Sequence, residues 1–155
     1  MDRIAIIFGG SGYIGTHLLS FFLEHKVFKR YYVLDINPLY KFDAYIDSGV
    51  VKYLLQDVRE SINFRIEDFN IKDSWIFNFA AIHREPGHEY KEYFDTNIIG
   101  AENINHFASK TNIKNIFFTS SIAPYGKSLA IRNESSNLYP ETAYGISKAF
   151  CEMIH

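Results

Sequence analysis

The sequence predicts an α/β fold, in which a doubly wound parallel sheet forms the middle of three layers and helices cover both faces. Short apolar runs alternate along the chain with longer stretches of helical spacing. The first apolar run ends in a glycine-rich turn that opens a helical stretch. The 155 residues are 47% hydrophobic and 22% charged, which suits a single globular core. Right-handed strand–helix–strand crossovers then make the sheet parallel.

The first half of the chain is predicted to contain three strands and one helix. Residues 3–8 are rich in isoleucine and are followed by glycines, which predicts a buried strand. Residues 12–27 have helical spacing, with one apolar stripe made of Ile14, Leu18, Leu19, Phe22 and Leu23. Residues 31–36 and 50–55 are further strands, whereas 38–49 has no regular pattern.

The second half adds two strands and two helices. Residues 75–81 and 115–120 are predicted strands. Residues 89–109 form a long amphipathic helix whose apolar positions are Tyr90, Tyr93, Phe94, Ile98, Ala101, Ile104 and Phe107. Residues 122–140 are predicted to be a loop, and another helix starts at Glu141 and contains the last residue of the sequence.

Composition excludes several classes of protein. The net charge of −2 leaves no basic footprint for nucleic acid. The single cysteine, Cys151, excludes an internal disulfide and an all-cysteine metal site, and the six histidines show no metal-ligand spacing, so no metal is predicted. No apolar run approaches the roughly 18 residues of a membrane span, and no signal peptide is expected. We therefore expect no membrane partner and a cytoplasmic protein.

The glycine-rich turn predicts a dinucleotide site. The first strand runs into Gly9-Gly10-Ser11-Gly12-Tyr13-Ile14-Gly15, which contains the glycine spacing of dinucleotide-binding domains. One glycine permits the tight turn, one lets backbone N–H groups approach a pyrophosphate, and one lets helix and strand pack closely. The pyrophosphate would lie at the helix amino terminus, where free N–H groups and the helix dipole favour anions. The alternative is a plain strand-to-helix turn.

The residues around the turn favour NAD. Asp35 ends the second predicted strand twenty positions after Gly15, where a carboxylate can accept both adenosine ribose hydroxyls and would repel a 2′-phosphate. NAD is therefore predicted over NADP. An ATP-binding P-loop would need lysine after the last glycine, and Thr16 stands there instead.

Tyr144, Lys148 and Ser121 suggest alcohol oxidation. Tyr144 and Lys148 are four apart in the last predicted helix and share one face. An ammonium near a tyrosine favours the phenolate and would lower its pKa from about 10. Such a base can take the hydroxyl proton when an alcohol gives up hydride. Ser121 follows the fifth strand, where open α/β sheets bind ligands, and can bond the same oxygen. A surface tyrosine packed on a lysine stem is the alternative for the pair alone.

These features together resemble the amino-terminal half of the extended short-chain dehydrogenase/reductases, within the NAD-dependent sugar-nucleotide epimerase/dehydratase family. Besides the glycine turn and Asp35, the matching segments in family order are Asn78-Phe79-Ala80-Ala81, Thr96-Asn97-Ile98-Ile99-Gly100, Ser120-Ser121 through Tyr125-Gly126, and Tyr144-Gly145-Ile146-Ser147-Lys148. The resemblance covers essentially all of the chain. It implies a Rossmann-like fold with NAD as cofactor and a nucleotide sugar as substrate.

The resemblance also implies roles for matching residues. The cofactor-binding set would be Gly9, Gly12, Tyr13, Ile14, Gly15, Asp35, Asp57, Val58, Ala80, Ala81, Asn97, Tyr144 and Lys148. Within it, Asp57 would face the adenine, and Ala80 and Ala81 would line the cofactor channel. The catalytic set would be Ser121 as hydroxyl partner, Tyr144 as base and Lys148 as the residue that binds ribose and lowers the tyrosine pKa. Asp57 as a helix or turn cap, and Asn97 as an ordinary helix-flank residue, are the alternatives.

The chain departs from the family pattern in length and at a few positions. Family members are about twice as long, so we expect residues 1–155 to be an incomplete NAD-binding domain, truncated before the last strands and the substrate-binding part. The sequence would then be a fragment or a truncated gene product that binds NAD and turns over poorly. Pro124, Asn78 and Ala101 also differ from the usual family residues, and none of these changes removes a catalytic group.

The implied activity has alternatives. In the complete enzyme, Tyr144 would remove the proton from a sugar hydroxyl, hydride would pass to NAD, and the keto-sugar would be epimerised, dehydrated or reduced again. A non-catalytic NAD-binding relative and a reductase of another small carbonyl compound are the other two classes. The family commonly dimerises through the two helices that correspond to 89–109 and 141–155 here, so a homodimer through them is a further expectation. The sequence does not identify the sugar.

Overall fold

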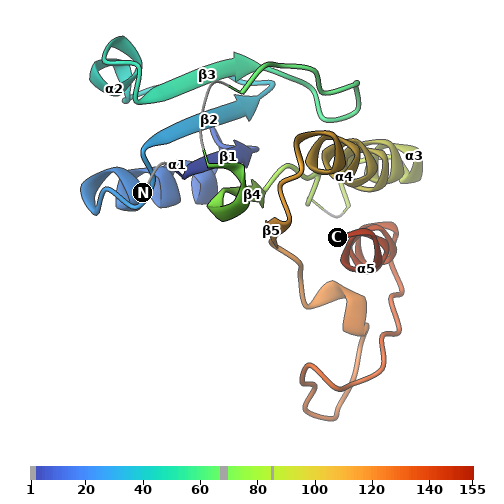
Figure 1. Cartoon of the computed structure of the whole chain (residues 1–155). Helices are drawn as coiled ribbons and strands as arrows, with labels where there is room; N and C mark the ends of the chain where they lie inside the picture. Colours follow the sequence, from blue (N-terminus) through green and yellow to red (C-terminus); the bar gives the residue numbers. More distant parts are fainter. Residues whose placement is uncertain (1–2, 67–69, 85) are drawn as a thin grey trace.

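The computed structural model describes residues 3–66, 70–84 and 86–155 and contains a five-stranded parallel sheet (Figure 1). The strands are β1 (Ile4–Phe8), β2 (Arg30–Asp35), β3 (Val51–Leu55), β4 (Trp75–Asn78) and β5 (Asn115–Phe118). Their order across the sheet is β3-β2-β1-β4-β5, and every pairing is parallel. The predicted α/β fold class is therefore confirmed, with all five strands in place. The carboxyl ends of all strands share one edge, where ligands bind in open sheets of this kind.

Two apolar cores cover the two faces of the sheet. Alternate residues of β1 point to opposite faces, so Ala5 and Ile7 belong to one core and Ile4, Ile6 and Phe8 to the other. The first core includes Leu19, Phe22 and Leu23 of α1 (Tyr13–Glu24). The second includes Ile104 and Phe107 of α4 (Ile99–Thr111). The predicted stripe on α1 was wrong for Ile14, which lies in the first turn of the helix and is 49% exposed, whereas the buried apolar residues Leu19, Phe22 and Leu23 lie further along it.

The predicted helix 89–109 is interrupted at its centre. It consists of α3 (Tyr90–Tyr93), a π-helical turn (Phe94–Ile98) and α4. A π turn inserts one extra residue, so positions before it rotate relative to the stripe that follows. Tyr90, predicted on the apolar stripe, is accordingly 74% exposed, while Tyr93 is buried. This interruption lies where the family-like motif places Asn97.

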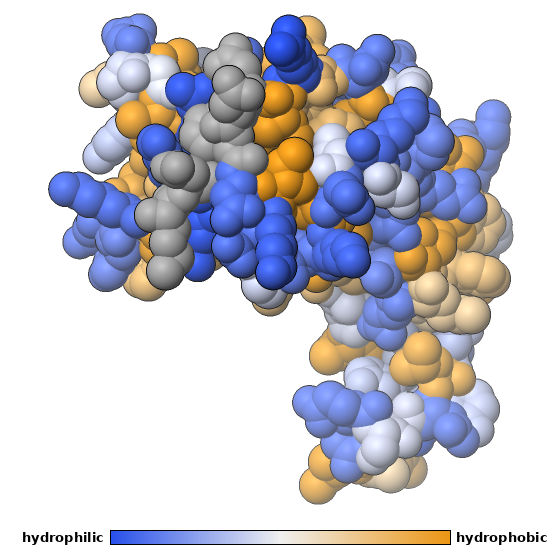
Figure 2. All heavy atoms as spheres, in the orientation of Figure 1, coloured by the Kyte–Doolittle hydropathy of each residue, from blue (hydrophilic) through white to orange (hydrophobic). Residues whose placement is uncertain are grey.

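The last helix, α5 (Ala143–Ile154), packs on the π turn and α4 on one side of the molecule (Figure 1). Short helices that were not predicted are α2 (Asp43–Asp47), in the stretch without a pattern, and 3₁₀ turns at Ile71–Asp73 and Ala123–Tyr125. The loop of 122–140 stands away from the body (Figure 1, Figure 2), and Leu129 and Ile131 on it are almost fully exposed. Within the described ranges, no helix combines the length and apolar character needed to cross a bilayer.

Candidate active and cofactor site

The glycine turn is packed tightly between the ends of β2 and β4. Gly9 has a φ of +70°, a left-handed conformation that favours glycine, and its N–H donates to the Leu34 carbonyl at 2.8 Å. A Cβ on Gly9 would lie 2.5 Å from the Ala80 backbone nitrogen, and a Cβ on Gly15 would lie 2.5 Å from the Gly10 Cα. The turn therefore holds the start of α1 close to the sheet and places Ala80 beside Gly9.

The amino end of α1 is open to a ligand. Gly12 caps the helix without a side-chain hydrogen bond, and a Cβ there would meet only the Gly9 carbonyl oxygen, at 3.2 Å. Tyr13 and Ile14 in the first turn are 81% and 49% exposed. The hydroxyl of Ser11, which the sequence did not single out, is buried without a hydrogen-bond partner among the described residues. An open helix amino terminus beside an unpartnered buried hydroxyl fits a pyrophosphate.

Asp35 ends β2 with its carboxylate turned toward the glycine turn. Its Oδ2 accepts a hydrogen bond from the Ser11 N–H at 3.0 Å. Its Oδ1 accepts from the backbone N–H of Asn37 at 2.9 Å and from the Asn37 amide at 3.3 Å. Three donors leave part of the roughly four acceptor positions of a carboxylate unused. The residues present therefore fit the adenosine ribose of a dinucleotide.

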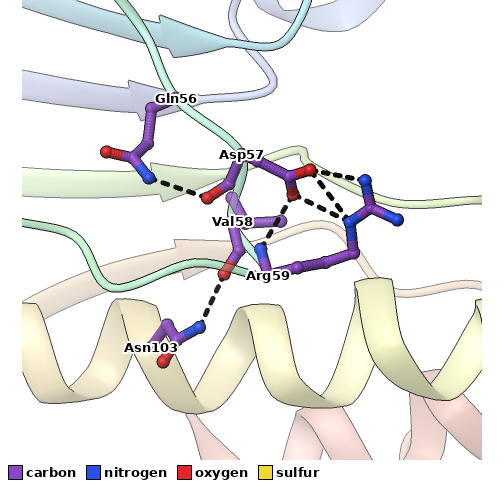
Figure 3. Close-up of polar contacts among 5 residues, drawn as sticks. All are labelled: Gln56, Asp57, Val58, Arg59 and Asn103. Atoms are coloured by element: carbon purple, nitrogen blue, oxygen red, sulfur yellow. Dashed lines mark hydrogen bonds and ion pairs between the residues drawn. The ribbon is translucent and has the colours of Figure 1, made fainter.

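Asp57 and Val58 follow β3 at the same sheet edge (Figure 3). The Arg59 guanidinium binds the Asp57 carboxylate and holds its pKa below the usual range. The backbone N–H of Arg59 also donates to Asp57 Oδ1 at 2.9 Å, so Asp57 does stabilise a local turn, as the capping alternative proposed. That role is compatible with a second one toward a ligand, because the turn stands at the sheet edge that holds Asp35.

Ser121, Tyr144 and Lys148 lie around the end of β5 and the first turns of α5. Thr142 begins α5, and its side chain accepts from the Gly145 N–H at 3.1 Å. Tyr144 follows in the first turn and is half-buried. The Ser121 hydroxyl oxygen accepts from the Ala123 N–H at 3.1 Å. The three candidate catalytic side chains make no hydrogen bond to one another.

Lys148 is 3% exposed, and its ammonium is held by two residues from the end of β5. Its Nζ donates to the Thr119 carbonyl at 2.5 Å and lies 4.0 Å from the centre of the Phe118 ring. Burial lowers the pKa of Lys148 from 10.5 to about 8. The ammonium retains N–H groups that this contact does not use.

We expect Lys148→Met to stabilise the chain at about pH 7, by an amount that shrinks as the pH rises. Between about pH 8 and 10.5 the unfolded wild-type chain binds more protons than the folded chain, so wild-type stability rises with pH there. Over this full pH range, the free energy of unfolding of the wild-type chain should rise by about 3 kcal/mol. Urea unfolding of wild type and Lys148→Met at about pH 7 and about pH 9 measures how the stability difference changes with pH. The exposed Lys114→Met is the control, and a pH-independent difference would contradict the expectation.

Asn97 connects the loop after β4 to α5. Its Oδ1 accepts from the Ile82 N–H at 2.9 Å, and its Nδ2 donates to the Ile82 carbonyl at 3.1 Å and to the Ser147 hydroxyl at 2.9 Å. Ser147 in turn donates to the Tyr144 carbonyl at 2.8 Å. Asn97 is thus a buried brace of the segment that carries Tyr144 and not an ordinary helix-flank residue. No local sequence pattern predicted Ser147 as the hydrogen-bond partner of Asn97.

A second buried network closes the far end of α5. His155 lies with Nδ1 2.8 Å from Asn105 Oδ1 and Nε2 2.9 Å from Asn78 Nδ2, which suits a neutral ring that donates through Nδ1 and accepts through Nε2. Burial, and to a smaller extent the Lys148 ammonium, lowers the pKa of His155 from 6.5 to about 4.

Acidification is expected to destabilise the chain through His155. Between pH 6.5 and about 4 the unfolded chain binds the extra proton and the folded chain does not, so stability falls as the pH falls. At about pH 5, His155 should lower the free energy of unfolding by about 2 kcal/mol relative to neutral pH. Thermal unfolding of His155→Gln should show a flatter pH dependence than wild type, whereas the exposed His25→Gln should not. Identical profiles for all three proteins would contradict the assignment.

We also looked for pockets and metal-ligand groups in the described chain outside the candidate site. Two surface hollows lie by the amino ends of β2 and β3, away from the carboxyl edge that carries the candidate residues; one is lined in part by Arg3, Phe28 and Tyr31. Within 3–66, 70–84 and 86–155, no group of three or more His, Cys, Asp or Glu side chains could hold a metal ion.

Comparison with known proteins shows the family to which this chain belongs. Residues 5–155 match the model of the NAD dependent epimerase/dehydratase family. The chain belongs to that family. It is similar to a UDP-glucose 4-epimerase of Rickettsia bellii, with 27% identity over 162 residues that cover 99% of this chain and 43% of the relative. The predicted family membership is thereby confirmed, and the chain spans less than half the length of that curated relative.

Solved structures of other proteins share the fold. A UDP-N-acetylglucosamine 4-epimerase from Methanobrevibacter ruminantium M1, in complex with UDP-N-acetylmuramic acid, superposes with a TM-score of 0.76 and 25% identity, over 98% of this chain and 49% of that one. The protein MoeE5, in complex with UDP-glucuronic acid and NAD, superposes with a TM-score of 0.75 and 19% identity, over 97% of this chain and 47% of that one. The Rossmann-like architecture extends over essentially the whole chain, which corresponds to about half of each structure.

Proposed function

We propose that the chain is the NAD-binding and catalytic half of an enzyme that epimerises or dehydrates a nucleotide sugar. The observation that carries this proposal is the Asp35 carboxylate bonded to the Ser11 N–H at the open amino end of α1, in a chain of this family. The names of the relatives, a UDP-glucose 4-epimerase among them, support a nucleotide sugar as substrate. Residues 1–155 would form one incomplete NAD-binding domain.

The cofactor would lie along the carboxyl edge of the sheet. The turn of Gly9, Gly12 and Gly15, with the N–H groups of Tyr13 and Ile14, would hold the pyrophosphate. Asp35 would bind the adenosine ribose, Asp57 and Val58 the adenine, and Ala80 and Ala81 would line the channel. Asn97 would act by bracing the loop at Ile82 against α5.

The chain's own residues would move the proton. Tyr144, as phenolate, takes the proton of a sugar hydroxyl while Ser121 donates a hydrogen bond to the same oxygen. The O–H bond of the hydroxyl and the C–H bond of the carbon that bears it break, and a C=O bond forms between that carbon and the oxygen. NAD, when bound, accepts the hydride that leaves this carbon. The Lys148 ammonium favours the phenolate form of Tyr144 and binds ribose through its unused N–H groups.

Titration of the folded chain with NAD and NADP tests the proposal. We expect saturable binding of NAD, and NADP bound at least about tenfold more weakly because Asp35 repels the 2′-phosphate. Asp35→Asn should reduce this preference. The appearance of reduced nicotinamide on adding each member of a panel of nucleotide sugars then separates an enzyme from a non-catalytic NAD-binding protein. Absence of saturable NAD binding would overturn the proposal.

A further inference from the structure

The segment that follows β5 is fixed to one side of α5 at two successive residues. The Thr119 carbonyl accepts a hydrogen bond from the Lys148 ammonium at 2.5 Å. The next residue, Ser120, donates its hydroxyl hydrogen to Glu152 Oε1. Lys148 and Glu152 are one helical turn apart, so both contacts lie on the same side of α5. Ser121, the candidate hydroxyl partner of the substrate, comes directly after these two contacts.

The chain beyond Ser121 is fixed to the first turn of the same helix. The Ser121 hydroxyl oxygen accepts from the Ala123 N–H at 3.1 Å. The backbone of Ala123 lies against Gly145, since a Cβ on Gly145 would be 2.8 Å from the Ala123 carbonyl oxygen. Tyr144 precedes Gly145 in that turn. Ser121 is therefore held between two contacts with the helix that carries Tyr144, the candidate base.

Glu152 makes the one contact of this pair that the candidate catalytic residues do not account for. Its side chain is exposed, and a carboxylate accepts a hydroxyl hydrogen bond more strongly than a neutral oxygen does. Glu152 also carries a charge near Lys148. Burial lowers the pKa of Lys148 to about 8, and the neighbouring Cys151 and Glu152 act in the opposite direction. Glu152 therefore has two routes to the site, a hydrogen bond to Ser120 and a charge beside Lys148.

We propose that Glu152 is a positioning residue for the proposed hydride transfer and acts through its hydrogen bond to Ser120. This bond fixes the Ser121 segment against α5, so that the Ser121 hydroxyl and the Tyr144 phenol reach the same substrate oxygen. A displacement of the segment by about 1 Å would misalign the two groups and slow the reaction. The inference rests on the proposed function, because it concerns the geometry of that reaction.

Three substitutions separate the hydrogen bond from the charge. In Glu152→Ala and Ser120→Ala, kcat for the formation of reduced nicotinamide should fall about tenfold, while KM and NAD affinity stay within about twofold. The double variant should lose no more than either single variant, because both remove the same bond. Glu152→Gln keeps an acceptor oxygen without the charge and should retain most of the rate. Glu24→Ala, which removes an exposed carboxylate on α1, is the matched control and should behave as wild type.

Amide hydrogen exchange tests the contact without any need for turnover. The Ala123 N–H should exchange at least about fivefold faster in Glu152→Ala and Ser120→Ala than in wild type, because the segment opens more often. In Glu152→Gln it should exchange as in wild type. The Ile82 N–H, in the loop after β4, should exchange at the same rate in all four proteins.

Several results would contradict the role of Glu152 in a wild-type chain that is active. A loss in Glu152→Gln as large as in Glu152→Ala, with Ser120→Ala unaffected, would show that Glu152 acts through its charge and would overturn the inference. Unchanged Ala123 exchange in both alanine variants, or an equal loss of NAD affinity and kcat, would also overturn it. Absence of NAD binding or of turnover in wild type would instead overturn the proposed function, and the inference with it.

Discussion

Tyr144→Phe is expected to abolish hydride transfer and to leave NAD binding unchanged. The substitution removes one oxygen atom, which makes no hydrogen bond to Ser121 or Lys148, the other candidate catalytic residues. The helix start is secured by other groups, namely Thr142 and the Ser147 bond to the Tyr144 carbonyl. The fold should therefore persist. Loss of a general base should lower the rate by about 10²- to 10⁴-fold.

The measurement is the rate at which reduced nicotinamide forms in the presence of whichever nucleotide sugar reacts with the wild-type chain. Calorimetric titration with NAD, run on the same preparation, shows that the cofactor site is intact. Tyr90→Phe is the matched control, because Tyr90 is 74% exposed on α3 and is not one of the candidate catalytic residues. A Tyr144→Phe rate within a few fold of wild type would remove Tyr144 as the base.

Gly9→Ala is expected to destabilise the fold by about 3 kcal/mol or more. The φ of +70° at Gly9 costs a residue with a Cβ about 1–2 kcal/mol. The added Cβ would also lie 2.5 Å from the Ala80 nitrogen and 2.7 Å from the Phe79 carbonyl carbon. Both atoms belong to the backbone, so the clash is relieved only by separating the ends of β1 and β4. For a chain of this size the melting temperature should fall by about 6–12 °C.

Gly12→Ala is the control within the same turn. Gly12 has a φ of −73°, and the only atom near its added Cβ would be the Gly9 carbonyl oxygen at 3.2 Å. We expect less than about 1 kcal/mol of destabilisation. NAD binding should nevertheless weaken, because the methyl group would cover the surface that a pyrophosphate approaches. Equal melting temperatures for the two variants would show that the close approach of Gly9 to β4 does not limit stability.

Local pattern predicted most of the architecture of this chain. The isoleucines of β1 and the glycines after it mark a buried strand and a tight turn, because both signals lie within a few consecutive residues. The same holds for Asp35, whose place at the end of an apolar run already puts it at the ligand edge of a parallel sheet. Helix α2 was missed because its five residues are too few to show a periodic pattern.

The π turn was missed for a different reason. A continuous amphipathic pattern from 89 to 109 predicts an uninterrupted helix, and the apolar residues alone do not show where one residue is inserted. The turn contains Asn97, which bonds Ile82 in the loop after β4 and Ser147 on α5. These partners lie 15 and 50 positions away along the chain, so local sequence does not specify them.

The strand segments, the glycine turn and the candidate residues could thus be assigned before any coordinates, since each depends on residues that are neighbours in the chain, whereas the order of the strands across the sheet came from the structure. The partners of those residues could not. Asp35 meets Ser11 across 24 positions, and Val58 meets Asn103 across 45. Such contacts form when the sheet brings the ends of its strands together and α4 packs across them. The physical reason is that side-chain periodicity reports which face of an element is buried, whereas hydrogen-bond partners depend on which elements become neighbours in space.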